Sequence, residues 1–297
     1  MSISQPSAVV PFHLVVQMTK GERHNTLSVA GLLLFPTLLV VCLSLLPLGF
    51  VALDSLNIGG GERGLDNYVR FTTSIFMRQA GFSIALVAAV ATIALVIAVP
   101  FTYLLAGMGR RWQALWLIYV LAQLSLSEVL IAFSWQILLS SKTGITNLFV
   151  WVGLMSESAS IVPSLGAVVI SLTYLSIPFA VLVLYPAFSR LDPNLTEAAR
   201  TMGAGPIRAF FSVVLPMMRR ALLTSAITLY VLNLGAIIVP QLLGKPRHWT
   251  LAVHISDQAI FQFNTPFASA LAIILLGLSV LILALLLRSA GKSERTT

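Results

Sequence analysis

The sequence predicts an all-α membrane protein with six transmembrane helices. Of its 297 residues, 58% are hydrophobic and only 9% are charged, whereas about 25% are charged in typical soluble proteins. In addition, six apolar runs are each long enough to cross a hydrocarbon core, which needs about 20 residues. We expect the six spans at residues 25–53, 79–109, 112–141, 158–189, 221–244 and 258–287.

The two ends of the chain are predicted to be tails outside the membrane domain. Residues 1–24 are polar and basic. This segment is too long before its apolar run, and too poor in a small-residue cleavage site, to favour a removed signal peptide. Residues 288–297 form a second basic tail, so the membrane domain covers 25–287. Pro36 and Pro47 are expected to kink the first span, which membrane helices tolerate when neighbours satisfy the freed carbonyls.

The polar segments between the spans are interpreted as loops. Residues 54–78 include Gly59-Gly60-Gly61-Glu62-Arg63-Gly64, which matches a dinucleotide-binding fingerprint by letter. The run follows a membrane span and not a strand, so a loop is the better interpretation. Arg110-Arg111 forms a short basic turn, and residues 142–157 and 245–257 are further loops.

The distribution of positive charge predicts the orientation in the membrane. Six spans place both termini on one side, and cytoplasmic loops are enriched in Lys and Arg. The side with both termini carries twelve such residues: Lys20, Arg23, Arg110, Arg111, Arg190, Arg200, Arg208, Arg219, Arg220, Arg288, Lys292 and Arg295. The other side carries six: Arg63, Arg70, Arg78, Lys142, Lys245 and Arg247. We therefore expect both termini in the cytoplasm. Because the net charge of +8 is dispersed among loops, it does not indicate a nucleic-acid partner.

A charged island, residues 189–220, separates the fourth and fifth spans. Asp192-Pro193-Asn194 is a helix-start signal, because Asp or Asn can cap a helix and Pro fits its first turn. Two helical turns over Thr196–Met202 are predicted to end at Gly203, which supplies a turn. An amphipathic helix over Ile207–Val214 follows.

The spacing within this island resembles a known motif. Glu197-Ala198-Ala199 is followed after three residues by Gly203, after nine more by Val213, and after one further residue by Leu215-Pro216. Pro216 is also expected to mark a helix boundary. The pattern is similar to the EAA loop of permease subunits in binding-protein-dependent ABC importers, with Val213 where isoleucine is usual. The resemblance implies a type I ABC importer permease fold, in which this loop is a cytoplasmic coupling helix that docks on an ATPase subunit. An ordinary amphipathic cytoplasmic loop is the alternative.

The residue types in the motif suit a docking helix. Small side chains at Ala198 and Ala199 would let another backbone approach closely, and Glu197 and Arg200 offer charge-assisted contacts at the rim. Gly203 lets the chain turn back. The candidate coupling residues are Glu197, Ala198, Ala199, Arg200, Gly203, Leu215 and Pro216.

The resemblance covers residues 67–244 and is closest to permeases of the spermidine/putrescine type. The supporting segments are Asn67-Tyr68, Tyr103-Leu104-Leu105-Ala106, Gly144-Ile145-Thr146-Asn147, Pro178-Phe179 and Val239-Pro240-Gln241-Leu242-Leu243-Gly244. The third span departs from the family, because many relatives have proline near Gln123 and arginine near Ile131. The implied solute is a polyamine or a similar small cationic or polar compound. Phosphonates, ferric iron and opine-like compounds are alternatives within the family.

The resemblance also implies a multi-subunit importer in the bacterial cytoplasmic (inner) membrane. The implied partners are a second permease subunit, two ATPase subunits that bind ATP and Mg, and a periplasmic or extracellular solute-binding protein. A paralogue is favoured over a second copy as the partner permease. This chain is expected to contact the lipid bilayer and to bind no cofactor, metal or nucleic acid. A secondary transporter is an alternative, but it predicts inverted repeats and paired membrane carboxylates, which the sequence does not show.

Polar residues inside the third span suggest a solute path. Glu128 is the only ionisable side chain in the middle of a predicted span, where a charge costs about 2.5–3.5 kcal/mol by insertion scales. On a continuous helix, Ser125, Glu128 and Ala132 would share one face, with Gln136 one turn further on. The Glu128 carboxylate could hold a cationic solute. A protonated or hydrogen-bonded glutamate in a subunit contact is the alternative.

The fourth and fifth spans add Tyr174, Thr228 and Asn233 as candidates for the solute path. Asn233 could instead form a hydrogen bond across helices, which membrane helices use for association. Packing is the favoured interpretation for Tyr174.

No catalytic or metal site is predicted. Gly291-Lys292-Ser293 has the end of a Walker A motif, but Leu286 stands where its first glycine must be. The four histidines show no metal-ligand spacing, and the single cysteine, Cys42, cannot form an internal disulfide. The chain is therefore expected to be a transport subunit without an ATPase site of its own.

Overall fold

A computed structural model of the protein describes residues 34–59, 62–141, 144–153 and 160–292. The predicted N-terminal tail lies outside these residues, whereas residues 288–292 of the predicted C-terminal tail are described and continue the last helix. The chain forms two compact units, residues 1–53 and 54–297. In the first unit, the described residues belong to an apolar helix that begins at Leu34 and runs to Asp54. The first predicted span, 25–53, is thus observed as a helix from residue 34 onward.

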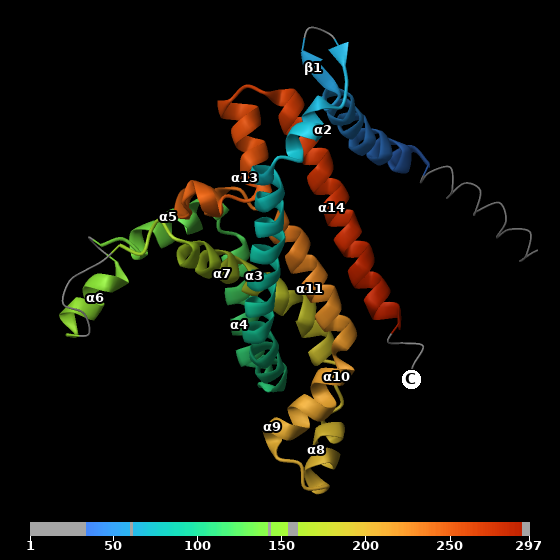
Figure 1. Ribbon diagram of the computed structural model, residues 1–297. Helices are drawn as coiled ribbons and strands as arrows, with labels where there is room; N and C mark the ends of the chain where they lie inside the picture. Colours follow the sequence, from blue (N-terminus) through green and yellow to red (C-terminus); the bar gives the residue numbers. More distant parts are fainter. Residues whose placement is uncertain (1–33, 60–61, 142–143, 154–159, 293–297) are drawn as a thin grey trace, which may run out of the picture. The chain divides into compact units, whose positions relative to one another are not determined.

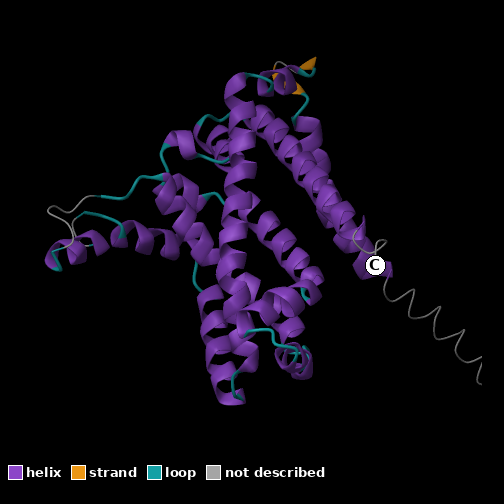
Figure 2. Ribbon diagram, turned by 60° about the horizontal axis from the view of Figure 1, so that its bottom comes forward, coloured by secondary structure: helices purple, strands orange, loops and turns teal. Residues whose placement is uncertain are grey.

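The second unit is almost entirely helical and is built around one long helix, α3 (Ser74–Gly107) (Figure 2). α7 (Leu165–Phe188) and α11 (Arg219–Leu234) pack against α3 and against each other (Figure 1). Small residues allow this close approach, since Ala94 and Ala98 of α3 and Ala180 of α7 are fully buried. Such residues are typical of helix contacts in membranes, where hydrophobicity does not drive association.

One end of this unit carries the only strands among the described residues. β1 (Asn57–Gly59) and β2 (Glu62–Arg63) pair antiparallel, with Asn57 opposite Arg63. The short helix α2 (Asp66–Phe71) follows and packs on the last helix, α14 (Thr265–Lys292). The Arg70 guanidinium lies 4.3 Å from the centre of the Phe267 ring, a cation–π contact. The predicted loop over residues 54–78 is therefore partly ordered around this contact.

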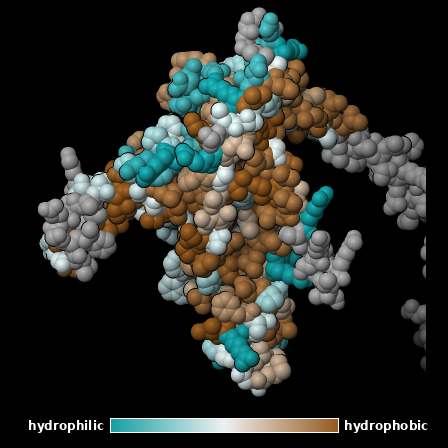
Figure 3. All heavy atoms as spheres, viewed as in Figure 1, coloured by the Kyte–Doolittle hydropathy of each residue, from teal (hydrophilic) through white to brown (hydrophobic). Residues whose placement is uncertain are grey.

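The opposite end carries the charged island as a set of short helices. These are α8 (Pro193–Thr201), α9 (Pro206–Ala209), the π-helix η1 (Phe210–Val214) and α10 (Leu215–Met217). Figure 3 shows brown, apolar residues over the middle of the unit and teal, hydrophilic residues toward its two ends. This is the distribution that membrane-spanning helices require.

The third predicted span is wrong as a single helix. It consists of α4 (Arg110–Leu124) and α5 (Glu128–Leu138), which are bent by 94° relative to each other. The side-chain oxygen of Ser125 donates to the Leu121 carbonyl at 3.2 Å, and that of Ser127 accepts from the Val129 N–H and caps α5. Serine hydroxyls compete with the helix for backbone groups in this way. The expected common face of Ser125, Glu128 and Gln136 does not form, because the helix changes direction between the first two.

The fifth predicted span, 221–244, is also interrupted. α11 ends at Leu234, and after Gly235 and two further residues a six-residue helix, α12 (Ile238–Leu243), begins. The segment Pro206–Met217 leads into α11 with a bend of 73°. This bend falls two residues after Pro216, close to the boundary that the proline predicted.

The remaining helices are short, except for α14. They are α6 (Ile145–Trp151), the 3-10 helix η2 (Pro246–His248), α13 (Leu251–Ser256) and the π-helix η3 (Asp257–Phe261). Within the described residues, four helices are long and apolar enough to cross a membrane, or six if each of two bent pairs is one span. The all-α class and the six-span count are therefore confirmed, although two of the six spans are not straight.

Local sequence determines both ends of α8. The Asp192 side chain accepts a hydrogen bond from the Asn194 N–H at 3.0 Å and caps the helix. At the other end, Gly203 has a φ of +88°, its N–H donates to the Arg200 carbonyl at 3.0 Å, and the Ala204 N–H donates to the Ala199 carbonyl at 3.1 Å. These two bonds form a Schellman motif. The predicted cap and turn are thus both confirmed.

We predict that Gly203→Ala loosens α8, whereas Gly205→Ala does not. Both glycines have open space where a Cβ would be added, but only Gly203 has a positive φ, at +88°. A left-handed conformation costs an alanine about 1–2 kcal/mol. Amide hydrogen exchange over residues 193–203 should therefore accelerate by roughly tenfold for Gly203→Ala. Equal exchange in the two variants would contradict this reading.

Candidate functional site

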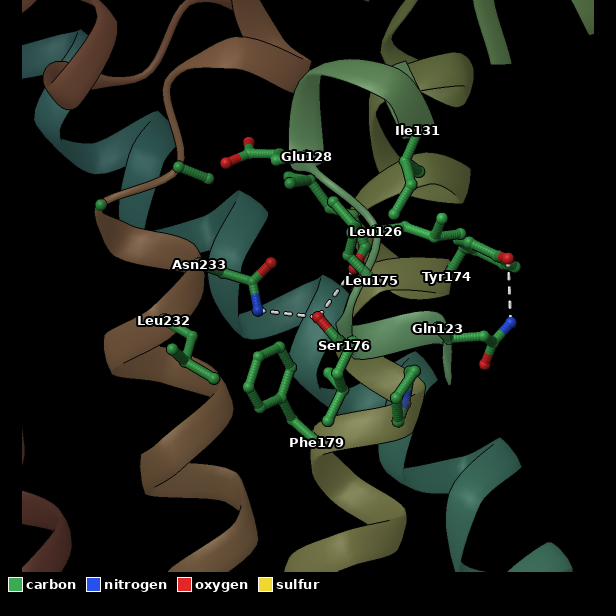
Figure 4. Close-up of a pocket in the computed structure, with 15 residues that line it drawn as sticks. Gln123, Leu126, Glu128, Ile131, Tyr174, Leu175, Ser176, Phe179, Leu232 and Asn233 are labelled. Carbon is green, nitrogen blue, oxygen red and sulfur yellow. Dashed lines mark hydrogen bonds between the residues drawn. The ribbon is translucent and has the colours of Figure 1, made fainter. Parts of the chain in front are cut away.

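A cavity of about 260 Å³ lies where the two interrupted spans meet α7. Its polar lining residues come from four helices (Figure 4). Gln123 lies on α4, Glu128 on α5, Tyr174 and Ser176 on α7, and Asn233 on α11. The apolar lining residues are Leu124, Leu126, Ile131, Leu172, Leu175, Pro178, Phe179, Leu232, Gly235 and Ala236. We call this cavity the central pocket.

Negative ends of two helices and positive ends of two others meet at the central pocket, so its preference for charge is set by its side chains. α4 ends at Leu124 and α11 ends at Leu234, and residues from both terminal turns line the cavity. The C-terminal end of a helix carries about half a negative charge from its unpaired carbonyls. None of the fifteen described residues that line the pocket is basic. The pocket therefore favours a cation over an anion.

Glu128 lies between the start of α5 and the start of α12. It is the first residue of α5, and the Val239 backbone in the first turn of α12 lies within hydrogen-bonding reach of its carboxyl group. A carboxylate at this place is stabilised by the positive ends of both helices. Its Oε1 atom is buried and has no hydrogen-bond partner among the described residues. Glu128 thus has one buried carboxylate oxygen without a partner among the described residues, beside the backbone of α12.

Asn233 connects α11 to α7 beside the pocket. Its Nδ2 atom donates to the Ser176 hydroxyl at 2.8 Å and to the Leu229 carbonyl at 2.7 Å. The Ser176 hydroxyl in turn donates to the Leu172 carbonyl at 2.7 Å. In Figure 4 the Asn233 amide oxygen points away from Ser176, toward the side of the pocket where Glu128 lies. The cross-helix bond considered for Asn233 therefore exists, and the same side chain also lines the pocket.

Tyr174 forms the wall opposite Asn233. Its hydroxyl accepts a hydrogen bond from Gln123 Nε2 at 2.9 Å (Figure 4). Its ring also makes an edge-to-face contact with Trp135, with the ring centres 5.7 Å apart. Tyr174 is therefore both packed and part of the pocket, so the two interpretations of this residue do not exclude each other.

The structure brings three of the six predicted path residues together and leaves three apart. Glu128, Tyr174 and Asn233 line the central pocket, whereas Ser125, Gln136 and Thr228 do not. Ser125 is exposed at the end of α4, and the Thr228 hydroxyl donates to the Thr224 carbonyl of its own helix at 2.9 Å. Gln136 is half-buried two turns beyond Glu128. These three remain predictions without a place in this pocket.

Sequence reasoning missed Ser176 as a lining residue and named Gln123 only as a position near which many relatives have proline. Each is identified as a lining residue only when its hydrogen-bond partner on another helix is known. Neither pair is visible in the sequence, because 51 residues separate Gln123 from Tyr174 and 57 separate Ser176 from Asn233.

The predicted coupling residues form a second site at the other end of the unit. Glu197, Ala198 and Arg200 are exposed on α8, whereas Ala199 is only 4% exposed. Ala198 is therefore the exposed small residue of the predicted docking surface, whereas Ala199 packs within the chain. Leu215 is half-buried against the core and Pro216 is exposed on α10. Glu197 and Arg200 also line a cleft of about 690 Å³ with the ends of α3 and α7.

The described residues contain no group of three or more His, Cys, Asp or Glu side chains that could hold a metal ion. His248 and His254 lie in the polar segment before α14 and do not form such a group. The pKa of His254 is lowered by burial, and Asp257 opposes this shift. His254 lies between the Phe76 and Trp249 rings, with centre distances of 6.1 Å and 5.8 Å.

Interrupted helices around a central cavity, with a capped helix exposed at one end, define a membrane permease. The sequence comparison agrees. Residues 98–291 match the family described as the binding-protein-dependent transport system inner membrane component. This match covers more than half of the chain, and the chain belongs to this family of ABC importer permeases.

The relatives found by sequence comparison include permeases of polyamine importers. The spermidine/putrescine transport system permease protein PotB of Haemophilus influenzae is 27% identical over 253 residues, which cover 85% of this chain and 86% of the relative. PotB of Escherichia coli K12 is 27% identical over 222 residues, covering 73% and 80% of the two chains. A sulfate transport system permease protein, CysT of Salmonella typhimurium, is 31% identical over only 121 residues, or 39% of this chain.

Solved structures share the fold. A bacterial ABC transporter involved in the import of the acidic polysaccharide alginate matches with a TM-score of 0.67 at 20% identity, covering 95% of this chain and 99% of the other. A structure of a bacterial alginate ABC transporter in complex with its alginate pentasaccharide-bound periplasmic protein matches with a TM-score of 0.68, also at 20% identity. The type I ABC importer permease fold is thereby confirmed.

We predict that Asn233→Leu destabilises the permease more than Thr228→Val does. Asn233 bonds to Ser176 of another helix at 2.8 Å, whereas Thr228 bonds only within α11. A hydrogen bond between membrane helices contributes about 0.6–2 kcal/mol. The midpoint of thermal unfolding of the detergent-solubilised complex should therefore fall for the first variant and change little for the second. Equal midpoints would show that the bridge contributes nothing measurable.

Proposed function

We propose that this permease forms part of the path of a small organic cation of the polyamine class and that α8 couples the path to ATPase subunits. The observation that carries the solute class is the Glu128 carboxyl group, whose Oε1 is buried without a partner. It lies in a pocket with no basic lining residue. The names of the polyamine permease relatives support the same class.

The chemistry of the pocket fits an ammonium group. Glu128 Oε1 can accept a charge-assisted hydrogen bond, which is about twice as strong as a neutral one. The rings of Tyr174 and Phe179 also line the pocket and can face the cation with their negative π-surfaces. Because the described lining contains a single carboxyl group, this subunit would bind one ammonium group. A solute with several ammonium groups would need acidic groups from the partner permease.

The alternative solutes fit this pocket less well. A phosphonate carries negative charge, which Glu128 would repel and which no described lining residue would balance. Ferric iron prefers several oxygen ligands of high charge density, and Glu128 is the one acidic residue in the described lining. A secondary transporter would require its own coupling ion and a repeat that places it.

The importer would be a complex of several subunits. A second permease, either a paralogue or a copy of this chain, would complete the path, and two ATPase subunits would bind ATP and Mg. A solute-binding protein would deliver the solute from outside, as the alginate-bound periplasmic protein in the similar structure suggests. The positive-inside distribution supports a cytoplasmic place for α8 and for both termini. Rigid-body movement of α8 on ATP-driven closure would then open the path on alternate sides.

We predict that Glu128→Gln lowers the uptake of spermidine at least tenfold. The amide keeps the size of the side chain, but it removes the negative charge that attracts an ammonium group. A tenfold loss corresponds to about 1.4 kcal/mol, within the range for one charge-assisted contact. The measurement is initial uptake by proteoliposomes that contain the full importer and its binding protein.

Two controls accompany this measurement. Ser134→Ala removes a hydroxyl from the same helix, which bonds only to the Leu130 carbonyl of its own backbone, and should leave uptake unchanged. ATPase stimulation by the binding protein should survive in both variants. Normal spermidine uptake by Glu128→Gln would remove Glu128 from the solute path.

We predict that Ala198→Trp uncouples transport from ATP hydrolysis, whereas Ala198→Ser does not. Ala198 is exposed, so the larger side chain does not disturb the interior of this chain, but it prevents close approach of a partner surface. Solute-stimulated ATPase activity of the reconstituted importer should fall to its basal level in the tryptophan variant. Retained stimulation in Ala198→Trp would exclude α8 as the docking helix.

A further inference from the structure

Two hydrogen bonds between glutamine and tyrosine side chains join α4 to α7. Near the island, the Tyr185 hydroxyl donates to Gln113 Oε1 at 3.1 Å. At the central pocket, Gln123 Nε2 donates to the Tyr174 hydroxyl at 2.9 Å. All four side chains are at least partly buried or face a neighbouring helix. We call these contacts the two Gln–Tyr bridges.

The spacing of the two bridges shows that α4 and α7 run antiparallel as a pair. Residue numbers rise along α4 from 113 to 123 and fall along α7 from 185 to 174. At a rise of 1.5 Å per residue, the bridges are about 15 Å apart along α4 and about 16 Å apart along α7. Because the two lengths agree, both bridges can form at once without either helix bending to meet the other.

The bridge near the island also fixes the end of α3. Gln113 Nε2 donates to the Ala106 carbonyl at 3.0 Å and to the Met108 carbonyl at 2.8 Å. A single amide group thus connects the last turn of α3, the first turn of α4 and the last turn of α7. The hydrogen-bonding capacity of its Nε2 donors is fully used.

Tyr185 lies at the point where the chain leaves α7 for α8. Its carbonyl accepts the Ser189 N–H at 2.9 Å and so closes the helix. Only residues 189–192 separate α7 from α8. The position of Tyr185 therefore determines where the short segment that leads into α8 begins.

We propose that Gln113 and Tyr185 are positioning residues that, together with the second bridge, make α4 and α7 one rigid strut between α8 and the central pocket. The proposal rests on the proposed coupling role of α8. A displacement of α8 reaches the end of α7 through four residues, and Tyr185 lies in that last turn of α7. The paired helices carry the displacement to Tyr174 and Gln123 at the pocket. Packed helices shift as units between discrete arrangements, and the bridges keep this pair from sliding.

The test uses variants of the full reconstituted importer that remove the bridge between Gln113 and Tyr185. Tyr185→Phe deletes one oxygen atom, and Gln113→Leu deletes the whole amide. Each should lower the solute transported per ATP hydrolysed by about threefold to tenfold, the equilibrium shift expected when one interhelical hydrogen bond is lost. Because both act on the same bridge, the double variant should be no worse than Gln113→Leu alone.

Tyr230→Phe is the matched control. It also deletes one tyrosine hydroxyl, on α11, but that hydroxyl has no hydrogen-bond partner among the described residues. It should leave transport per ATP unchanged. A readout independent of activity is amide hydrogen exchange over residues 186–192, which should accelerate in Tyr185→Phe and Gln113→Leu and not in Tyr230→Phe.

The possible results separate this inference from the proposed function. Unchanged coupling and unchanged exchange in both bridge variants, with Ala198→Trp uncoupled, would overturn the strut and leave the coupling role of α8 intact. Retained coupling in Ala198→Trp would instead overturn the proposed role of α8, and the strut with it. Equal losses in Tyr230→Phe and Tyr185→Phe would also overturn the strut, because the effect would not depend on the contact between helices.

Discussion

The structure depends on satisfying the backbone where two membrane spans are interrupted. A free N–H or C=O group in hydrocarbon costs several kcal/mol, so broken helices occur only where protein or water covers the break. Here α4/α5 and α11/α12 are interrupted beside the same cavity. Glu128 begins one resumed helix and reaches the Val239 backbone in the first turn of the other. Glu128 therefore places the start of one resumed helix beside the start of the other.

This arrangement explains why a carboxyl group can stand at membrane depth. Its charge is balanced by the positive ends of α5 and α12 and not by a basic side chain. The described lining of the pocket accordingly contains no basic side chain beside Glu128. Balance by helix ends leaves one carboxylate oxygen without a fixed partner. The same feature that holds the broken spans together thus also creates a site with a preference for positive charge.

Local signals in the sequence were sufficient for some elements and not for others. Asp192 and Gly203 act on their own neighbours, so the start and end of α8 could be predicted from residue types alone. The breaks at Ser125–Ser127 and Gly235 could not, because the sequences on both sides are equally apolar and no proline marks them. Whether serine or glycine ends a membrane helix is decided by the groups that cover the break, and these come from distant parts of the chain. The pairing of Asn233 with Ser176 was missed for the same reason.

The positions of polar residues indicate that α3 and α7 have different structural roles. α3 is long, apolar and buried along much of its length, so it provides a fixed centre. The described side-chain hydrogen bonds between helices involve α7 repeatedly: it receives bonds from Gln123 and Asn233 and gives one to Gln113. α7 is also the helix that continues into the charged island. A transporter must couple an event at one end to a change in a cavity near its middle. Hydrogen bonds are directional, so they resist sliding between helices better than dispersion contacts, which are individually weak and have no direction. The bonds are concentrated on the helix for which that resistance would be most useful.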